Sequence, residues 1–249
     1  MNIKLLRMAS LFAAACLLTA VGHTQAIISE NFTDGVTINN WYFINGACLT
    51  AGTSSSLASP GSPPACTAIQ NSYYGSGNPL NGGQNGVMPD TIGQGALRFT
   101  NGQCCGYAQN GAIISTTPFS SSAGVQVTFK TYTYYGDSGG IGGDGADGMS
   151  FFLMDGSVAP NIGSWGGSLG YTCSNQNPPY TGLTGAYLGL GIDEYGNFLN
   201  GSTGTYNTGS FNANDNTASG LGANTQTPEE IGLRGAGTVS WAWLNKNHP

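Results

Sequence analysis

The sequence has very few charged residues. Asp, Glu, Lys and Arg make up 7% of the 249 residues, against roughly 25% in an average soluble domain. Lys and Arg number 6 and Asp and Glu number 12, which gives a formal net charge of −6. A face that binds nucleic acid needs clustered basic side chains to displace the counterions of the phosphates. We therefore expect neither nucleic acid nor an anionic membrane surface as a partner.

The chain also lacks the residues that several common catalytic and metal sites need. Its 2 histidines are His23, which lies in the signal peptide expected over residues 1–26, and His248, close to the last residue. The sequence contains no Cys-x-x-Cys pair, no P-loop and no EF-hand loop. Zinc sites, Ser-His-Asp triads and Cys-His dyads are therefore excluded, and we expect no enzyme of these classes.

Hydrophobic residues, by contrast, are frequent enough to form a core. They account for 39% of the chain, and glycine supplies 41 residues. An excess of Gly, Ser, Thr and Asn beside such a core predicts turns and loops, and not disorder. No segment after the leader has a convincing helical period, and no linker divides residues 27–249. We expect one all-β domain over 27–249, an antiparallel β-sandwich of short strands.

The first residues have the pattern of a secretory signal peptide over 1–26. Lys4 and Arg7 form a positively charged start, and Met8–Val21 is nearly all apolar or small. That run is shorter than the roughly 20 residues a membrane-spanning helix needs. We expect cleavage, a secreted or cell-surface protein, and no membrane insertion afterwards. A lipoprotein leader, modified at Cys16, is the alternative.

Five cysteines remain after the expected cleavage, namely Cys48, Cys66, Cys104, Cys105 and Cys173. In an oxidising compartment they should form disulfides. Cys48–Cys66 is the natural local bridge, because it closes a Ser- and Pro-rich loop. The odd count leaves one thiol over, which is either free or bonded to a partner beyond Pro249.

Patterns of apolar residues predict the strands. The clearest is Val125–Thr131, where apolar and polar residues alternate. Met149–Met154 is a continuous apolar run, which predicts a strand buried on both faces. The long segments 49–95 and 200–227, rich in Gly, Ser and Asn, are expected outside the core. Further strands are expected at Ala96–Phe99, Ala112–Ile114, Tyr187–Ile192 and Thr238–Leu244.

Two acidic segments adjoin these strands. Gly143–Gly148 precedes one strand, and Gly191–Asn197 ends another. Carboxylate and amide oxygens in glycine-rich turns suit calcium, which takes roughly six to eight oxygen ligands. Two acidic turns without a ligand are the alternative. A glycosidase needs two carboxylates facing one another, whereas the neighbours Asp193 and Glu194 would point to opposite faces of a strand.

Four segments together are similar to a known family. Gly145–Leu153 resembles the Ala-Asp-Gly start of a strand in L-type (legume-like) lectins, and Gly166–Gly170 resembles their Gly-Gly loop. Leu190–Phe198 is similar to the metal-binding strand and loop of that family, and Pro228–Gly235 to the strand that follows. The match to bacterial members is the best, in order and spacing over about residues 95–240.

This resemblance implies a concanavalin A-like jelly-roll, an antiparallel β-sandwich. The family continues with further strands beyond the position of Pro249, so we expect a sandwich that is incomplete at its C-terminal end. The resemblance also implies that Asp147, after a cis Ala146–Asp147 peptide, binds sugar hydroxyls. The backbone N–H of Gly167 and the side-chain amide of Asn197 would bind the same sugar.

The same resemblance implies a calcium site. The manganese site of the family needs a Glu and a His where this chain has Gly191 and Glu230, so we expect calcium and no manganese. Aromatic residues beside the acidic segments could stack on sugar rings or belong to the core; they are Tyr134, Tyr135, Trp165 and Tyr171. The calcium ligands would be Asp193, the carbonyl of Tyr195, Asn197 and Asp215.

The sequence therefore predicts calcium-dependent carbohydrate binding by an exported, bacterial lectin-like adhesin. Its partners would be glycans or glycoconjugates, and it would have no catalytic residues. A structural or adhesive β-sandwich without glycan binding is the alternative, and a glycoside hydrolase on the same fold is a weaker third.

Overall fold

The structure is a computed structural model that describes residues 28–69, 88–100, 109–133, 145–174, 177–198 and 228–239. The chain divides into two compact units. The described part of the first is Phe119–Thr128, and the second contains the other described residues, including all the strands. The expected signal peptide, residues 1–26, lies outside the described residues.

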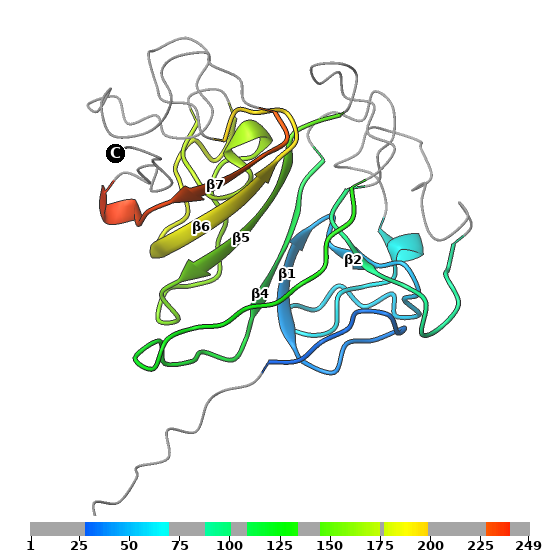
Figure 1. The fold of residues 1–249 in the computed structure, drawn as a ribbon. Helices are drawn as coiled ribbons and strands as arrows, with labels where there is room; N and C mark the ends of the chain where they lie inside the picture. The colour runs from blue at the N-terminus through cyan, green and yellow to red at the C-terminus, as the bar shows by residue number, and fades with distance from the viewer. Residues whose placement is uncertain are drawn as a thin grey trace, which may run out of the picture. The chain divides into compact units, whose positions relative to one another are not determined.

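Antiparallel sheets make up the second unit (Figure 1). The helical elements among the described residues are short 3-10 turns, η1 (Cys66–Ala68), η4 (Gly166–Ser168) and η5 (Gly237–Val239). The described chain is therefore all-β, as the sequence predicts. Two of the sheets have two strands each: one pairs β1 (Trp41–Asn45) with β4 (Gly111–Ser115), and the other pairs β2 (Cys48–Leu49) with β3 (Leu97–Arg98). The third sheet has three strands, in the order β5 (Gly148–Met154), β6 (Ala186–Asp193) and β7 (Glu230–Arg234).

The three-stranded sheet brings three segments together at one end. Gly148, the first residue of β5, lies opposite Asp193, the last residue of β6. Glu230, the first residue of β7, lies opposite the same Asp193. The turn before β5, the loop after β6 and the start of β7 therefore meet at one end of this sheet (Figure 1).

Glycines in β6 make room for aromatic rings. A Cβ at Gly189 would lie 2.5 Å from the ring of Tyr171, and a Cβ at Gly191 would lie 2.2 Å from the ring of Phe198. The rings therefore pack directly on the backbone of the strand. They belong to a buried cluster of Leu169, Tyr171, Leu183, Ala186 and Phe198, against which Phe152 and Met154 pack.

Strand β5 is less buried than its sequence predicts. Met149–Met154 is a continuous apolar run, yet every residue of β5 is only half-buried. Within the described residues β5 is an edge strand, because β6 pairs with one of its sides and no described strand pairs with the other. The expectation of burial on both faces was wrong for this reason.

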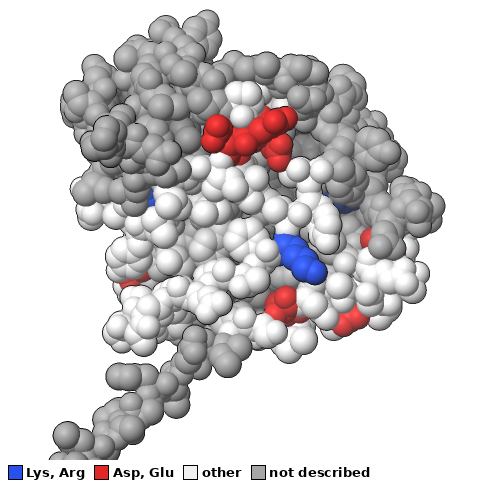
Figure 2. All heavy atoms as spheres, viewed as in Figure 1, with Lys and Arg blue, Asp and Glu red and all other residues white. Residues whose placement is uncertain are grey.

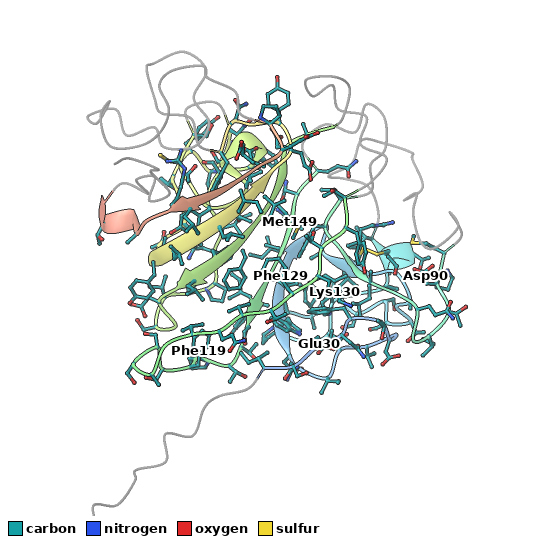
Figure 3. All side chains as sticks on the ribbon, in the orientation of Figure 1. Glu30, Asp90, Phe119, Phe129, Lys130 and Met149 are labelled. Carbon is teal, nitrogen blue, oxygen red and sulfur yellow. A yellow bond between two sulfur atoms is a disulfide. The ribbon has the colours of Figure 1, made fainter. Side chains whose placement is uncertain are left out.

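The clearest predicted strand, Val125–Thr131, is not part of a sheet among the described residues. Its last part follows β5 through side chains: the Phe129 ring stacks on Phe151 with centroids 5.7 Å apart, and the Thr131 hydroxyl donates to the sulfur of Met149 (Figure 3). Alternation describes which way side chains point in an extended segment, and a segment can be extended without forming ladder hydrogen bonds.

Part of the Gly- and Ser-rich segment belongs to the core, contrary to expectation. The predicted disulfide Cys48–Cys66 is present. Beside it, the N–H of Leu49 donates to the carbonyl of Pro64 at 2.8 Å, and a Cβ on Gly52 would lie 2.5 Å from Ala65 Cα. Small residues let two backbones approach closely, so they are buried here despite their composition. The buried residues are Ala47, Cys48, Leu49, Thr50, Ala51, Pro63, Pro64, Ala65 and Cys66.

The remaining strand predictions have mixed outcomes. Ala96–Phe99, Ala112–Ile114 and Tyr187–Ile192 coincide with β3, β4 and β6. The predicted strand Thr238–Leu244 is wrong at its start, because Thr238 lies in η5. Its continuation from residue 240 onward, and the segment 200–227, lie outside the described residues.

Candidate functional site

The backbone of Asp147 is held between β5 and the loop that follows β6. The Ala146–Asp147 peptide is cis, as the resemblance predicts. The carbonyl of Asp147 accepts hydrogen bonds from the N–H groups of Glu194, at 3.0 Å, and Tyr195, at 3.1 Å. Gly148 follows at φ +133°, where a Cβ would lie 2.2 Å from the carbonyl oxygen of Ile192. Glycine at this position therefore allows the two turns to pack directly on each other.

The side chain of Asp147 is half-buried, and its carboxylate receives no hydrogen bond from any described residue. Its burial raises the pKa of this carboxyl to about 6, because removal from water disfavours the charged form. A carboxylate accepts hydrogen bonds and donates none when it is ionised. Asp147 is therefore a ready acceptor for a ligand that carries hydroxyl or N–H groups.

Asp193, by contrast, has hydrogen bonds within its own loop. Its side chain is buried, with one oxygen accepting from the N–H of Gly196 at 2.9 Å and the other from the N–H of Phe198 at 2.6 Å. Burial raises the pKa of Asp193 to about 6, and the nearby charge of Asp147 adds to this effect, whereas the loop N–H groups oppose it. Asp193 thus organises the loop 193–198 and lies close to a second carboxylate.

Arg234, at the end of β7, contacts this loop at Phe198. It is completely buried, and its Nε–H donates to the carbonyl of Phe198 at 2.6 Å. Its guanidinium carbon lies 5.5 Å from the centre of the Phe198 ring, a distance typical of a cation–π contact. Burial lowers the pKa of Arg234 to about 9, while Cys173, Asp193 and Tyr171 raise it. Arg234 thus places a positive charge close to the carboxylate of Asp193.

The Gly-Gly turn lies beside Asp147. Gly166 adopts φ +67°, and a Cβ at this residue would lie 3.8 Å from Asp147 Oδ2. Gly167, the next residue, is buried in η4. The structure therefore brings η4, the turn before β5 and the loop after β6 to one place. Acidic side chains gather on the surface at this end of the sheet (Figure 2).

Most of the predicted site residues therefore lie close together. Tyr195 and Asn197 are half-buried in the loop that Asp193 organises. Among the aromatic residues, Trp165 is half-buried, whereas Tyr171 is buried and belongs to the core cluster, its hydroxyl donating to the carbonyl of Gly235 at 2.7 Å. The positions predicted from sequence that lie outside the described residues are Asp215, Tyr134, Tyr135, Cys104 and Cys105.

Sequence analysis missed the part played by Arg234. A lone arginine at the end of an apolar strand segment, Ile231–Leu233, was the available signal, since a buried cation needs hydrogen-bond acceptors or an opposite charge. The presence of glycine at position 191 is also explained only by the structure. The Phe198 ring occupies the space that a side chain at 191 would need, so glycine at this position allows the ring to pack on the strand.

The oxygen-rich donor set suits a hard cation such as calcium. Oxygen atoms in this loop are supplied by the carboxylate of Asp193, the carbonyl of Tyr195 and the side chain of Asn197, and calcium prefers carboxylate, carbonyl and amide oxygens. Within the described ranges, no group of 3 or more His, Cys, Asp or Glu residues could hold a metal ion. A cation here would therefore rely on carbonyl and amide oxygens as well as on carboxylates.

The arrangement is poorly suited to acid–base hydrolysis. Asp147 and Asp193 are close enough for their charges to interact. However, Asp193 is 1% exposed and both of its oxygens accept loop N–H groups. A catalytic carboxylate must reach the reacting atoms of the substrate. Of this pair, only Asp147 has a carboxylate that accepts no hydrogen bond from the described residues.

No protein-family model, no curated protein and no solved structure matches this chain. In the part of the chain that the structure describes, no helix has the length and apolar character needed to cross a membrane. The geometry and chemistry of the site itself are therefore the basis for inferring function.

Proposed function

We propose that this protein binds carbohydrate through Asp147, with calcium ordering the adjacent loop 193–198. The observation that carries the proposal is the half-buried carboxylate of Asp147, which receives no hydrogen bond from the described residues. An ionised group in this situation costs folding free energy. Sugar hydroxyls that donate to it would offset that cost through charge-assisted hydrogen bonds.

Each neighbouring residue has a role in this proposal. The N–H of Gly167 would donate to the sugar, and Asn197 would contact it through its amide. Calcium, when bound, supplies positive charge that keeps nearby carboxylates ionised. No transition-metal ion is required. The calcium ligands would be Asp193, the carbonyl of Tyr195, the side-chain oxygen of Asn197 and, from the segment after this loop, Asp215.

The finer fold belongs to the same proposal. A concanavalin A-like jelly-roll sandwich is supported by the antiparallel β5–β6–β7 sheet and by the turns that meet at its end. Export through residues 1–26 would place the protein outside the cell or on its surface. There it would bind glycans or glycoconjugates without chemical conversion. One site of this kind binds a single sugar weakly, so adhesion would need several copies.

A structural module without a ligand is the second candidate. It is favoured by the loop 193–198, in which Asp193 and Arg234 supply hydrogen bonds from within the chain. Such a loop does not depend on a cation to satisfy its backbone groups. The two candidates differ in what they require of Asp147, because a structural module gains nothing from an ionised side chain that lacks donors.

A glycan-array assay separates the two candidates. The protein from residue 27 onward is applied to the array in calcium chloride and again in the presence of a chelator. We expect binding that is lost with the chelator and in Asp147→Ala, with the far-UV circular dichroism melting curve of the variant unchanged. Asp155→Ala is the matched control, because Asp155 follows β5 at the end of the strand opposite to Asp147.

A folded wild-type protein that binds no glycan in calcium would contradict carbohydrate binding and favour the structural module. Binding that persists unchanged in Asp147→Ala would exclude Asp147 as the sugar contact.

A further inference from the structure

We propose that Asn177 is a second side chain that contacts the ligand, beside Asp147, and that it selects among sugars by the orientation of one hydroxyl. This inference rests on the proposed carbohydrate binding and extends it to a residue outside the four segments that resemble lectins.

The backbone around Asn177 is held in a defined position. Its N–H donates to Ser174 Oγ at 3.1 Å, and its carbonyl accepts from the N–H of Tyr180 at 3.0 Å. The next residue, Pro178, accepts a hydrogen bond from the N–H of Trp165 at 3.2 Å. Trp165 directly precedes the Gly-Gly turn, so the backbone of this turn and that of Asn177 are joined.

The side chain of Asn177 shares one small space with the carboxylate of Asp147. A Cβ placed on Gly166 would lie 2.4 Å from Asn177 Nδ2 and 3.8 Å from Asp147 Oδ2. Both polar atoms therefore lie over the same glycine, and any larger residue at 166 would displace the amide. Because Gly166 adopts φ +67°, both the backbone conformation and the space favour glycine.

The two polar groups do not satisfy each other. No hydrogen bond joins Asn177 to Asp147, and the side-chain amide of Asn177 has no hydrogen-bond partner among the described residues. Half-buried polar groups that face a common space without a partner are able to bind a ligand that brings both donors and acceptors. A hydroxyl group is both a donor and an acceptor.

The chemistry of the pair matches a ligand with adjacent hydroxyls. Ionised Asp147 only accepts hydrogen bonds, whereas the amide of Asn177 can donate and accept. A sugar hydroxyl would donate to Asp147, and the same or the neighbouring hydroxyl would bond to Asn177. An epimer whose neighbouring hydroxyl points the other way would leave the amide without a partner. Sites that hydrogen-bond a hydroxyl discriminate against ligands that lack it in this way.

The test compares Asn177→Ala with wild-type protein from residue 27 onward. Both are applied over a range of concentrations, in calcium chloride, to an array that includes glycans ending in mannose, glucose and galactose. We expect the apparent Kd for the best-bound glycan to rise about tenfold, the size of one lost hydrogen bond. The preference among the three sugar endings should also shrink.

Calcium affinity, titrated by calorimetry without sugar, and the melting temperature should not change, because Asn177 is neither a proposed calcium ligand nor a source of side-chain hydrogen bonds. Asn40→Ala is the matched control: Asn40 is exposed and precedes β1, so its removal should leave the array profile as it is.

An unchanged Kd and an unchanged preference in Asn177→Ala, with binding lost in Asp147→Ala, would overturn the role of Asn177 and leave carbohydrate binding intact. A folded wild-type protein that binds no glycan on the array would overturn both proposals.

Discussion

Two irregular segments of the second unit, 47–66 and 193–198, are held in place by different interactions. The first has a disulfide, Cys48–Cys66, and buried small residues packed against one another. The second has a buried carboxylate, Asp193, that accepts loop N–H groups, and Arg234, which donates to a loop carbonyl. Covalent and apolar contacts do not respond to ions, whereas a segment held by charges does. The proposed calcium site lies in the second of these segments, the loop 193–198.

Replacement of the buried cation should have the largest effect on stability. Arg234→Met leaves the carbonyl of Phe198 without this donor and removes a positive charge near buried Asp193. We expect the free energy of unfolding, measured by urea denaturation with a chelator present, to fall by about 3 kcal/mol. Arg98→Met, at a half-buried arginine of β3, should cause a clearly smaller loss. Equal losses in the two variants would show that the contacts of Arg234 contribute no more to stability than those of Arg98.

Loss of the disulfide should destabilise the other segment without affecting the site. The double variant Cys48→Ala/Cys66→Ala removes a bridge between residues 18 positions apart. A loop of this size predicts a decrease in the free energy of unfolding of about 3 kcal/mol. The calcium affinity of the folded protein, measured by calorimetry, should remain unchanged. A large drop in calcium affinity would mean that the two segments are coupled.

Asp193→Asn should affect stability less than these changes, and it should also abolish the response to calcium. The amide has the same shape, but one of its ends presents N–H groups to the N–H of Gly196 or Phe198. We expect a loss of about 2 kcal/mol. The wild-type melting temperature should rise with calcium, because a ligand of the folded state stabilises it. That of the variant should not rise.

Asp155→Asn is the control for this comparison. Asp155 accepts from the N–H and hydroxyl of Ser157 and lies beyond the opposite end of β5. Its replacement should leave the response to calcium unchanged. A normal calcium response in Asp193→Asn would contradict the assignment of Asp193 as a ligand.

Asp147→Asn should have the smallest effect on stability, and of opposite sign. Burial raises the pKa of Asp147 to about 6, above its ordinary value of 3.8, so at pH 7 the folded state carries a charge that burial disfavours. A neutral amide removes this cost. We expect urea denaturation with a chelator to give a free energy of unfolding up to about 1 kcal/mol higher, together with loss of glycan binding. A marked destabilisation would instead indicate a structural role.

The local pattern of the sequence predicted the all-β class and most of the observed strands. Ala112–Ile114 and Tyr187–Ile192 lie within β4 and β6, because half-buried strands need apolar side chains at regular intervals. It did not predict β1 (Trp41–Asn45), which forms through pairing with β4, some 70 residues later. It also predicted a strand at Val125–Thr131, which is in no sheet among the described residues, because alternation does not show whether a partner strand is present.

The residues of the candidate site likewise divide into those predicted from local sequence and those whose role only the structure shows. Asp147, Gly167, Asp193, Tyr195 and Asn197 were predicted from short segments that resemble those of L-type lectins. Arg234 and Asn177 were not assigned to the site. Nothing in the neighbouring sequence of either residue indicates which groups surround it, and each obtains its role from segments far away in the chain.

The sequence by itself determined the class of structure, the local disulfide and the positions of the acidic, glycine-rich turns, because these depend on residues that are near one another in the chain. Only the tertiary structure decided which polar groups are satisfied. Asp193 accepts the N–H groups of its own loop, and the pairing of β6 with β7 places Arg234 near that loop, while the carboxylate of Asp147 and the amide of Asn177 face a common space over Gly166. Burial and hydrogen bonding depend on all surrounding segments at once, so two aspartates of similar sequence context acquire different roles.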